Sequence, residues 1–315
     1  GVIERDDTAV EVVAVNDLPP VATLAHLLRY DSTYGRWPVG IEAHGEDLCV
    51  GGRLVRVFGE SDPAARDWRS LGVDLVVEAT GRFRTREQAA VHLARGGRKV
   101  VLTTPGKNVD VTVVMGLNED TYCAAEHDVV SNASCTTNCA APMVQVLHQA
   151  FGIRHGLLTT VHSYTGDQNL LDGPHKDLRR ARAAAVNMIP TSTGAAKAIS
   201  AIIPELAGRL DGIAVRVPVQ DVSLVDLTVE LAEQATIGQV NRAFAAPAAG
   251  YLKGILRYTT DPIVSHDVLG VPASSLLVTS LPLVTPTPAH SVGSHAHPRG
   301  SPHPPHLPWA QPAPP

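Results

Sequence analysis

The chain has 315 residues, a formal net charge of −5 and a sequence pI near 6.3. A weakly acidic chain without a run of basic residues lacks the electrostatic footprint of a nucleic-acid-binding protein. No apolar stretch approaches the roughly 20 residues that span a bilayer, and the first residues lack the basic start and apolar core of a secretion signal. We therefore expect a cytoplasmic protein without a nucleic-acid or membrane partner.

The first 134 residues carry short β-branched runs that are apolar almost throughout: "EVVAVN", "DLVVEAT", "KVVLTTP", "VTVVMGL" and "DVVSNAS". Such runs are typical of parallel strands covered on both faces, and "TREQAAVHLARGG" predicts a helix with a glycine stop. Around a Gly-Gly pair, "GIEAHGEDLCVGGRLVRVFG" alternates and predicts an inserted hairpin. The pattern predicts a doubly wound, Rossmann-type α/β domain over residues 1–134. Its G-x-G-x-x-G fingerprint is absent, so we expect the domain to lack its first strand and glycine-rich loop.

The texture changes after residue 150. The runs "GLLTTVHSYT", "LDGIAVRVPV" and "SLVDLTVEL" are longer and half-polar, which predicts a mainly antiparallel sheet with one covered face. Helices are expected at "GAAKAISAIIPEL" and "GQVNRAFAAP". A long ordered loop is expected between the first of these strands and the first of these helices. We place this α+β catalytic domain at residues 135–275. A Pro/His-rich tail, 276–315, is expected to be disordered, and its abrupt onset suggests an incomplete or frame-shifted reading of the gene.

Four cysteines occur in the chain: Cys49, Cys123, Cys135 and Cys139. Their spacing matches neither a disulfide framework nor a zinc site, so we expect reduced thiols and no metal centre. In "SNASCTTNC", Cys135 lies where a strand gives way to a helix, with Asn132 and Ser134 as candidate caps. Free N–H groups and the helix dipole at such a point favour a thiolate and lower the thiol pKa. The alternative is that Cys135 and Cys139, four apart on one helical face, are simply buried thiols.

His162 follows an apolar run in "TTVHSYTGDQ" and is a candidate base and acid for a cysteine. A lone strand histidine is more often structural. The basic segment "HKDLRRARAAA" has a similar alternative, a solvated face, which we favour for Arg179 and Arg182. Arg216, in contrast, lies within the apolar run "GIAVRVPV", where an unpaired charge is costly and an anionic partner is expected.

Together the segments "SNASCTTNCAAP", "TTVHSYTGDQ", "HKDLRRARAAA", "PTSTGAAKA" and "RVPVQDVSLVDL" resemble, in order and spacing, the phosphorylating glyceraldehyde-3-phosphate dehydrogenase family. The resemblance covers about residues 11–268. It implies an NAD-dependent enzyme that oxidises glyceraldehyde 3-phosphate in glycolysis and uses inorganic phosphate to form 1,3-bisphosphoglycerate. It also implies a homotetramer in which the 163–192 loop lies near a neighbouring cofactor site.

The resemblance assigns roles to individual residues. Cys135 would attack the aldehyde to give a thiohemiacetal and later a thioester, and His162 would serve as its base and acid. Positions that bind the substrate phosphate and inorganic phosphate are matched by Ser134, Thr136, Thr165, Arg180, Thr193, Gly194 and Arg216. Positions that line the cofactor cleft are matched by Asp17, Ser61, Thr80, Thr103 and Gly166.

Asp17 is the acidic residue expected at the tip of the second strand of the dinucleotide-binding domain, where it accepts bonds from a ribose and its charge favours NAD over NADP. By itself it could equally be a turn residue or a helix cap. Gly166 replaces a side chain common in the family, so its contact would be through the backbone. The family's "WYDNE"-like strand and its closing helix have no counterpart near the end of the chain. Two alternatives stay open. One is an erythrose-4-phosphate dehydrogenase, although the segment "PTSTGAAKA" favours the triose phosphate as substrate. The other is a truncated, non-catalytic remnant.

Overall fold

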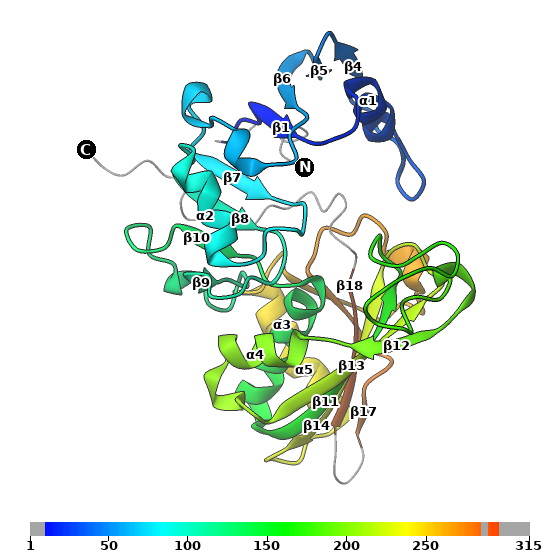
Figure 1. Cartoon of the computed structure of the whole chain (residues 1–315). Helices are drawn as coiled ribbons and strands as arrows, with labels where there is room; N and C mark the ends of the chain where they lie inside the picture. The colour runs from blue at the N-terminus through cyan, green and yellow to red at the C-terminus, as the bar shows by residue number, and fades with distance from the viewer. Residues whose placement is uncertain (1–9, 285–288, 296–315) are drawn as a thin grey trace. The chain divides into compact units, whose positions relative to one another are not determined.

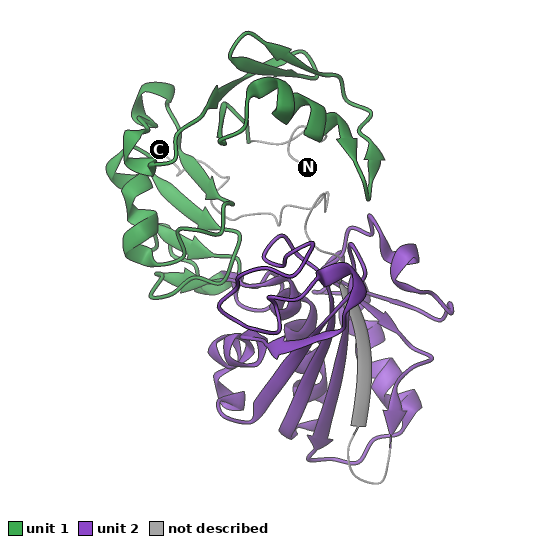
Figure 2. Cartoon of the chain, turned by 45° about the vertical axis from the view of Figure 1, so that its right-hand side comes forward, with its two compact units in different colours: residues 1–112, 120–132, 302–315 green, residues 113–119, 133–301 purple. Residues whose placement is uncertain are grey.

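The computed structural model describes residues 10–284 and 289–295. Figure 2 shows two compact units, which are described separately. Among these residues, unit 1 contains 10–112 and 120–132, and unit 2 contains 113–119, 133–284 and 289–295.

The first sheet of unit 1 has the strand order β1-β6-β5-β4. Its strands are β1 Ala14–Asn16, β4 Ile41–His44, β5 Asp47–Val50 and β6 Arg53–Phe58, and the helix beside them is α1 Val21–Arg29. β1 and β6 are parallel, whereas β5 and β6 form the expected antiparallel hairpin. Its turn is made by Gly51 and Gly52, whose φ angles of 58° and 79° are the left-handed values that a tight hairpin requires. A short pair, β2 Tyr30–Asp31 and β3 Gly35–Arg36, follows α1.

The second sheet of unit 1 is parallel, with the order β7-β8-β10-β9. Its strands are β7 Leu75–Glu78, β8 Lys99–Leu102, β9 Val111–Thr112 and β10 Val129–Ser131. Helix α2, Arg86–Ala94, begins with a capping box in which Thr85 accepts from the backbone of Gln88. Every apolar run expected to be a strand in this domain is one, and the expected α/β fold class is confirmed. Within the described residues, β1 pairs only with β6, and β7 only with β8.

Unit 2 is built on one mixed, mainly antiparallel sheet, with the order β12-β13-β11-β14-β18-β16-β15 and β17 paired with β18. Its strands are β11 Ile153–Ser163, β12 Ile189–Ser192, β13 Leu210–Val217, β14 Ser223–Leu231, β15 Leu256–Thr259, β16 Ser275–Val278, β17 Leu283–Val284 and β18 Ala289–His295. Residues of β14 alternate between buried and half-buried, because one face of the sheet is covered.

Three helices cover that face (Figure 1): α3 Cys135–Phe151, α4 Ala195–Ile202 and α5 Ile237–Ala249. Helix α3 lies at the centre, where Met143 and Leu147 are fully buried among side chains of α4, α5 and β14. Buried residues run from Thr136 to Leu147 of this helix, so its start is packed into the core and its first residue, Cys135, is held firmly. Short 3₁₀ helices complete the fold at Pro63–Ala65, Arg69–Leu71, Glu119–Thr121, Ala184–Val186, Pro204–Leu206 and Ser265–Val268.

The tail differs from its expected disorder. Residues 275–278 and 283–284 form β16 and β17, and 289–295 form β18, which pairs with β14 over its whole length. The reason is that the run "LLV" at 276–278 is apolar and is buried in the sheet together with Ser275, although the sequence around it is rich in proline. This corrects the prediction for the described part of 276–295. The segments 285–288 and 296–315 lie outside the described residues.

None of the helices in residues 10–284 and 289–295 is long and apolar enough to cross a lipid bilayer.

Candidate active site

Cys135 is the first residue of α3, as expected. Ser134 is the N-cap, and its hydroxyl accepts a hydrogen bond from the backbone N–H of Thr137 at 3.0 Å. The turn into the helix places Ala133 at a φ of 55°, a left-handed conformation that costs a non-glycine residue about 1–3 kcal/mol and often marks functional sites. The local sequence therefore presents the Cys135 sulfur at a capped helix start.

The imidazole of His162 lies against that sulfur. Cys135 Sγ and His162 Nε2 are 3.4 Å apart, and His162 is 4% exposed near the end of β11. Both residues belong to unit 2, so their distance is fixed within one compact body. This geometry has the separation expected of a nucleophile and its base.

The other ring nitrogen of His162, Nδ1, contacts both an acceptor and a donor. Nδ1 lies 2.7 Å from the backbone oxygen of Ser163, and Arg216 Nη1 donates to that same oxygen at 2.9 Å. Arg216 Nη1 also lies 2.9 Å from Nδ1, but an arginine nitrogen can only donate. We assign the proton to Nδ1, because Ser163 then accepts from both groups. In this tautomer Nε2 carries a lone pair on the side that faces the Cys135 sulfur.

Cys135 and Cys139 behave differently. Cys139 is fully buried, its thiol lies 3.5 Å from Ser275 Oγ, and burial raises its pKa to about 12. It is the inert buried thiol of the two. Cys135 is only partly buried and faces an imidazole, so the simple reading of both as core thiols does not hold for it.

The pKa of Cys135 differs from the sequence expectation. Burial raises it above the ordinary thiol value, and the backbone N–H and hydroxyl of Thr136 and the positive charge of Arg216 lower it only in part. The start of the helix, which lowers the pKa, is visible in the sequence, whereas the enclosure of the sulfur, which raises it, is not. Cys135 is therefore a thiol that needs a base at the moment of attack, and His162 is the base within reach.

Arg216 is a positive group near the Cys135 sulfur, and the charge of Arg180 lies close enough to act on Arg216. The pKa of Arg216 is lowered by burial and also by the charge of Arg180. Within the described residues, the buried Nε of Arg216 has no hydrogen-bond partner. A buried cation with an unpaired donor is suited to an anion, because an anion supplies the missing hydrogen bond, whereas Arg180 is already paired with Asp167.

The register of the sheet explains why Arg216 contacts His162. His162 of β11 and Arg216 of β13 are direct partners in a parallel pair, so both side chains leave the sheet on the same face. Arg216 is the last residue but one of its strand. The strand order thus brings two residues 54 apart in sequence to one edge of the sheet.

The remaining predicted phosphate residues lie at three other points of unit 2. The hydroxyl of Thr136 hydrogen-bonds Cys135, and Ser134 is the cap described above. Thr193 and Gly194 precede α4, where Gly194 is the N-cap and Thr193 Oγ1 accepts from Ala195 N at 3.2 Å. The backbone N–H of Thr165, just after β11, hydrogen-bonds the side chain of Gln168 at 3.4 Å.

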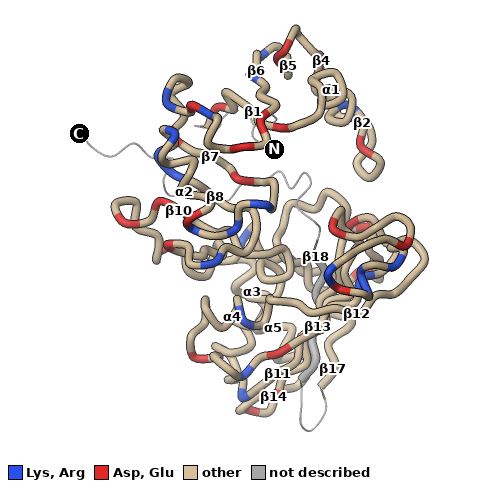
Figure 3. The backbone as a smooth tube through the Cα atoms, viewed as in Figure 1, with Lys and Arg blue, Asp and Glu red and all other residues tan. Residues whose placement is uncertain are grey.

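Two aspartates near Arg180 were not anticipated. Arg180 Nη1 donates to Asp167 Oδ2 at 2.7 Å, and its Nε donates to Thr191 Oγ1, which in turn donates to Asp177 Oδ2 at 2.7 Å. The arginine holds the pKa of Asp167 below its usual range against the opposing effect of burial. Figure 3 shows positive and negative residues interleaved in the segment that leads into β12. The signal was the "TGDQ" aspartate, placed two residues after Thr165.

The predicted cofactor residues of unit 1 follow the carboxyl ends of its strands. Asp17 follows β1, Ser61 lies just beyond β6, and Thr80 and Thr103 follow β7 and β8; all are exposed. Asp17 and Ser61 are brought together, because Asn16 exchanges hydrogen bonds of 2.9 and 3.1 Å with the backbone of Glu60.

Thr80 and Thr103 form a second pair, which meets at one residue. The side chain of Glu78 accepts from Thr80, and its backbone oxygen accepts from Thr103 N at 3.1 Å. An exposed carboxylate and hydroxyls at the carboxyl ends of parallel strands fit the ribose hydroxyls and amide of a dinucleotide. Gly166 belongs to unit 2, where a side chain at its position would meet open space.

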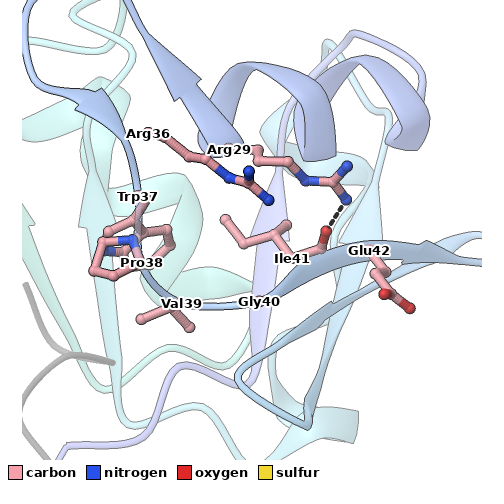
Figure 4. A pocket seen from close by; sticks show the side chains of 8 residues that line it. All are labelled: Arg29, Arg36, Trp37, Pro38, Val39, Gly40, Ile41 and Glu42. Atoms are coloured by element: carbon pink, nitrogen blue, oxygen red, sulfur yellow. Dashed lines mark hydrogen bonds between the residues drawn. The ribbon is translucent and has the colours of Figure 1, made fainter.

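Unit 1 also has a hollow of about 420 Å³, which does not contain the predicted cofactor residues. Figure 4 shows its lining between α1 and β4, with Arg29 donating to the backbone oxygen of Ile41. Arg36, also in the lining, is exposed and lies with its guanidinium 5.9 Å from the ring of Tyr30. None of the predicted site residues lines this hollow.

Comparison with known proteins is consistent along the chain. The family model "Glyceraldehyde 3-phosphate dehydrogenase, NAD binding domain" matches residues 2–86, and "Glyceraldehyde 3-phosphate dehydrogenase, C-terminal domain" matches 134–290. The chain is 55% identical over 268 residues to glyceraldehyde-3-phosphate dehydrogenase of Geobacillus stearothermophilus, and these aligned residues cover 85% of this chain and 80% of the relative. It is 53% identical over 276 residues to that of Streptomyces coelicolor, which covers 87% and 82%.

Proposed function

Because the chain belongs to the glyceraldehyde 3-phosphate dehydrogenase family, we propose that Cys135 is the nucleophile and His162 the base of its reaction. That reaction is the NAD-dependent, phosphorylating oxidation of glyceraldehyde 3-phosphate in glycolysis. The observation that carries the assignment is the 3.4 Å contact between the Cys135 sulfur and His162 Nε2 at the start of α3.

The first step joins Cys135 to the aldehyde. The sulfur forms a bond to the carbonyl carbon, the thiol proton passes to His162 Nε2, and His162 returns it to the carbonyl oxygen. The product is a neutral thiohemiacetal. The raised pKa of the Cys135 thiol makes this transfer necessary, because little thiolate forms without a base.

The second and third steps use the same imidazole and an anion site. His162 removes the hydroxyl proton of the thiohemiacetal as hydride leaves the carbon, which gives a thioester on Cys135. NAD supplies the hydride acceptor. An oxygen of inorganic phosphate then attacks the thioester carbon, the carbon–sulfur bond breaks to release the acyl phosphate, and the departing Cys135 thiolate takes the proton that His162 has held since the hydride step.

Arg216 serves this cycle in two ways. Its unpaired Nε is a donor for a phosphate oxygen, and its Nη1 holds the Ser163 carbonyl that fixes the tautomer of His162. Arg180 and Thr165 complete the same anion site, with Ser134, Thr136, Thr193 and Gly194 as the remaining phosphate donors.

NAD is the cofactor of the family, and we assign Asp17 and Ser61 to its adenosine half. Thr80 and Thr103 of unit 1 are assigned to further contacts with the cofactor, and the backbone of Gly166, in unit 2, is assigned the cofactor contact that the family resemblance implies. The exposed carboxylate of Asp17 accepts bonds from ribose hydroxyls and repels a 2′-phosphate, which favours NAD over NADP.

The long loop that precedes β12 supports a homotetramer. Its side chains Leu170, Leu171 and Leu178 are 79%, 76% and 81% exposed, which is unusual for leucines that lie close together in sequence. A second copy of the chain would cover them. Sedimentation of the purified protein should give four copies, and Leu178→Asp should shift it toward smaller species. All four cysteines are free thiols, as suits the reducing cytoplasm that we propose as its location.

The test is NADH formation from glyceraldehyde 3-phosphate with and without inorganic phosphate. We expect turnover that requires phosphate, its loss in Cys135→Ser, and its retention in Cys123→Ser, which alters an exposed thiol of unit 1. Phosphate-independent turnover, or full activity of Cys135→Ser, contradicts the proposal.

A further inference from the structure

Glu78, whose carboxylate is buried, joins the two threonines assigned to the cofactor in unit 1: its carboxylate binds Thr80 and its backbone oxygen binds Thr103. Glu78, the last residue of β7, is 5% exposed. Its Oε1 accepts hydrogen bonds from the backbone N–H of Thr80 at 2.8 Å and from the Thr80 hydroxyl. Its backbone oxygen accepts from Thr103 N at 3.1 Å and lies 3.4 Å from the Thr103 hydroxyl. One residue thus fixes two loops that follow neighbouring strands.

The other carboxylate oxygen is held from behind by a histidine and a tryptophan. Glu78 Oε2 lies 3.2 Å from His92 Nε2, and His92 Nδ1 lies 3.2 Å from the indole nitrogen of Trp68. An indole N–H can only donate, so Nδ1 of His92 is an acceptor and its proton is on Nε2. The ring therefore donates to Glu78.

The chain Trp68–His92–Glu78–Thr80 has one consistent set of donors and acceptors. Burial by itself raises the pKa of Glu78, but the hydrogen bonds from His92 and Thr80 outweigh it and leave the pKa below its ordinary value. Glu78 is the charged partner of His92 among the described groups within hydrogen-bond reach of the ring. An ionised, fully hydrogen-bonded carboxylate in a buried place holds its partners in one geometry.

The backbone around His92 is equally constrained. Gly97 N donates to the His92 backbone oxygen at 3.0 Å, and a side chain on Gly97 would meet a Val76 methyl at 2.9 Å. The ring of Phe83 packs edge-on against the imidazole at 6.4 Å. His92 is in the last turn of α2, whose start is fixed by its capping box. The helix therefore aims the imidazole at Glu78.

We propose that Glu78 is a positioning residue for Thr80 and Thr103 in cofactor binding, and that His92 and Trp68 hold its carboxylate in place. The inference rests on the proposed role of those threonines. It also defines what Thr80 offers a ligand. The Thr80 hydroxyl gives its proton to Glu78 and accepts from Arg82 N at 3.1 Å, which leaves one lone pair. Thr80 therefore accepts from a ligand hydroxyl or amide N–H and disfavours a phosphate oxygen.

The experiment compares variants of His92 in NAD binding and in tryptophan emission. Trp37→Phe and Trp309→Phe make Trp68 the reporter. In that background His92→Phe, which removes the donor to Glu78, should shift Trp68 emission and raise the Kd for NAD by roughly 3- to 15-fold, the loss expected of one or two neutral hydrogen bonds. His92→Gln keeps a donor toward Glu78 and should retain most of the affinity. The control, His44→Phe, changes an exposed residue of β4 in the same unit.

A second variant tests the inventory of donors directly. Glu78→Gln offers one acceptor and one donor, so it can satisfy either Thr80 or His92 but not both, and it should weaken NAD binding like His92→Phe. If wild type and the His44 control bind NAD and folded His92→Phe binds it equally well, the inference is wrong while the proposed function stands. If none of them binds NAD but all are folded, the proposed cofactor roles fail, and the inference falls with them.

Discussion

Replacing His162 by asparagine tests the role of the imidazole as the base for Cys135. Asparagine keeps a polar side chain near the sulfur but cannot take a proton. At pH 7 a thiol with the ordinary pKa of about 8.5 is only about 3% thiolate. The thiolate fraction of Cys135 is smaller still, because burial raises its pKa. A positioned base contributes roughly 10²- to 10⁴-fold, so we expect kcat/KM to fall by about that factor.

The pH dependence of the rate distinguishes loss of the base from a general loss of structure. Without a base, the rate follows the thiolate of Cys135 itself, and it should rise about tenfold per pH unit over roughly pH 6 to 8. Initial rates of NADH formation and alkylation of Cys135 by iodoacetamide, followed by peptide mass, measure both effects. The matched control is His155→Asn, on the same strand, where the side chain is 68% exposed. Activity of His162→Asn within a few-fold of wild type, or a flat pH profile, would refute the reasoning.

Three further predictions concern charge, ionisation and packing. Arg180→Gln should raise KM for the phosphorylated substrate by roughly 10- to 100-fold, the worth of a charge-assisted hydrogen bond, whereas Arg179→Gln, an exposed neighbour, should leave it near wild type in the same steady-state assay. Cys139 has a raised pKa in the folded protein, so the unfolded chain loses its proton first as pH rises, and stability falls between the two values. Denaturant titration should therefore show the stability of wild type relative to Cys139→Ala dropping by about 1.4 kcal/mol per unit from roughly pH 9 toward pH 12, and a constant difference would contradict the burial of this thiol. Phe244→Ala in the fully buried core of unit 2 should cost about 3–5 kcal/mol of unfolding free energy, and a loss below 1 kcal/mol would show that the core is not packed as described.

Much of the fold could be predicted because its signals are local. The Gly-Gly pair at 51 and 52 fixed the hairpin through its backbone conformation, and the serine before Cys135 marked the start of α3. The apolar runs of unit 1 predicted parallel strands, since both faces of such a sheet are covered. What could not be read in this way was the tail, where the apolar run of β16 lies within a proline-rich composition.

The site was predictable in its members but not in its electrostatics. Position in a motif identified Cys135, His162 and Arg216, but the raised pKa of Cys135 depends on how the folded chain encloses the sulfur. The contact of Arg216 with the carbonyl beside His162 depends on the register of β11 and β13, which periodicity does not define. Neither enclosure nor register is a property of a short segment.

The role of Glu78 was missed for a related reason. Its signal was present, because a glutamate inside the apolar run "DLVVEAT" must find partners if it is buried. Its partner His92 lies on α2 and is itself held by Trp68, and only the packing of unit 1 brings these residues together. A charged residue in a buried strand is thus a useful place to look for a positioning group.

The most direct test of the account is the identity of the residue that becomes acylated. The enzyme is mixed with glyceraldehyde 3-phosphate and NAD in the absence of inorganic phosphate, quenched in acid, digested and analysed by peptide mass. The account predicts a 3-phosphoglyceryl thioester on the peptide that contains Cys135, which disappears when phosphate is added before the quench. An adduct on Cys139 or Cys123 instead, or NADH formation with Cys135 unmodified, would contradict it.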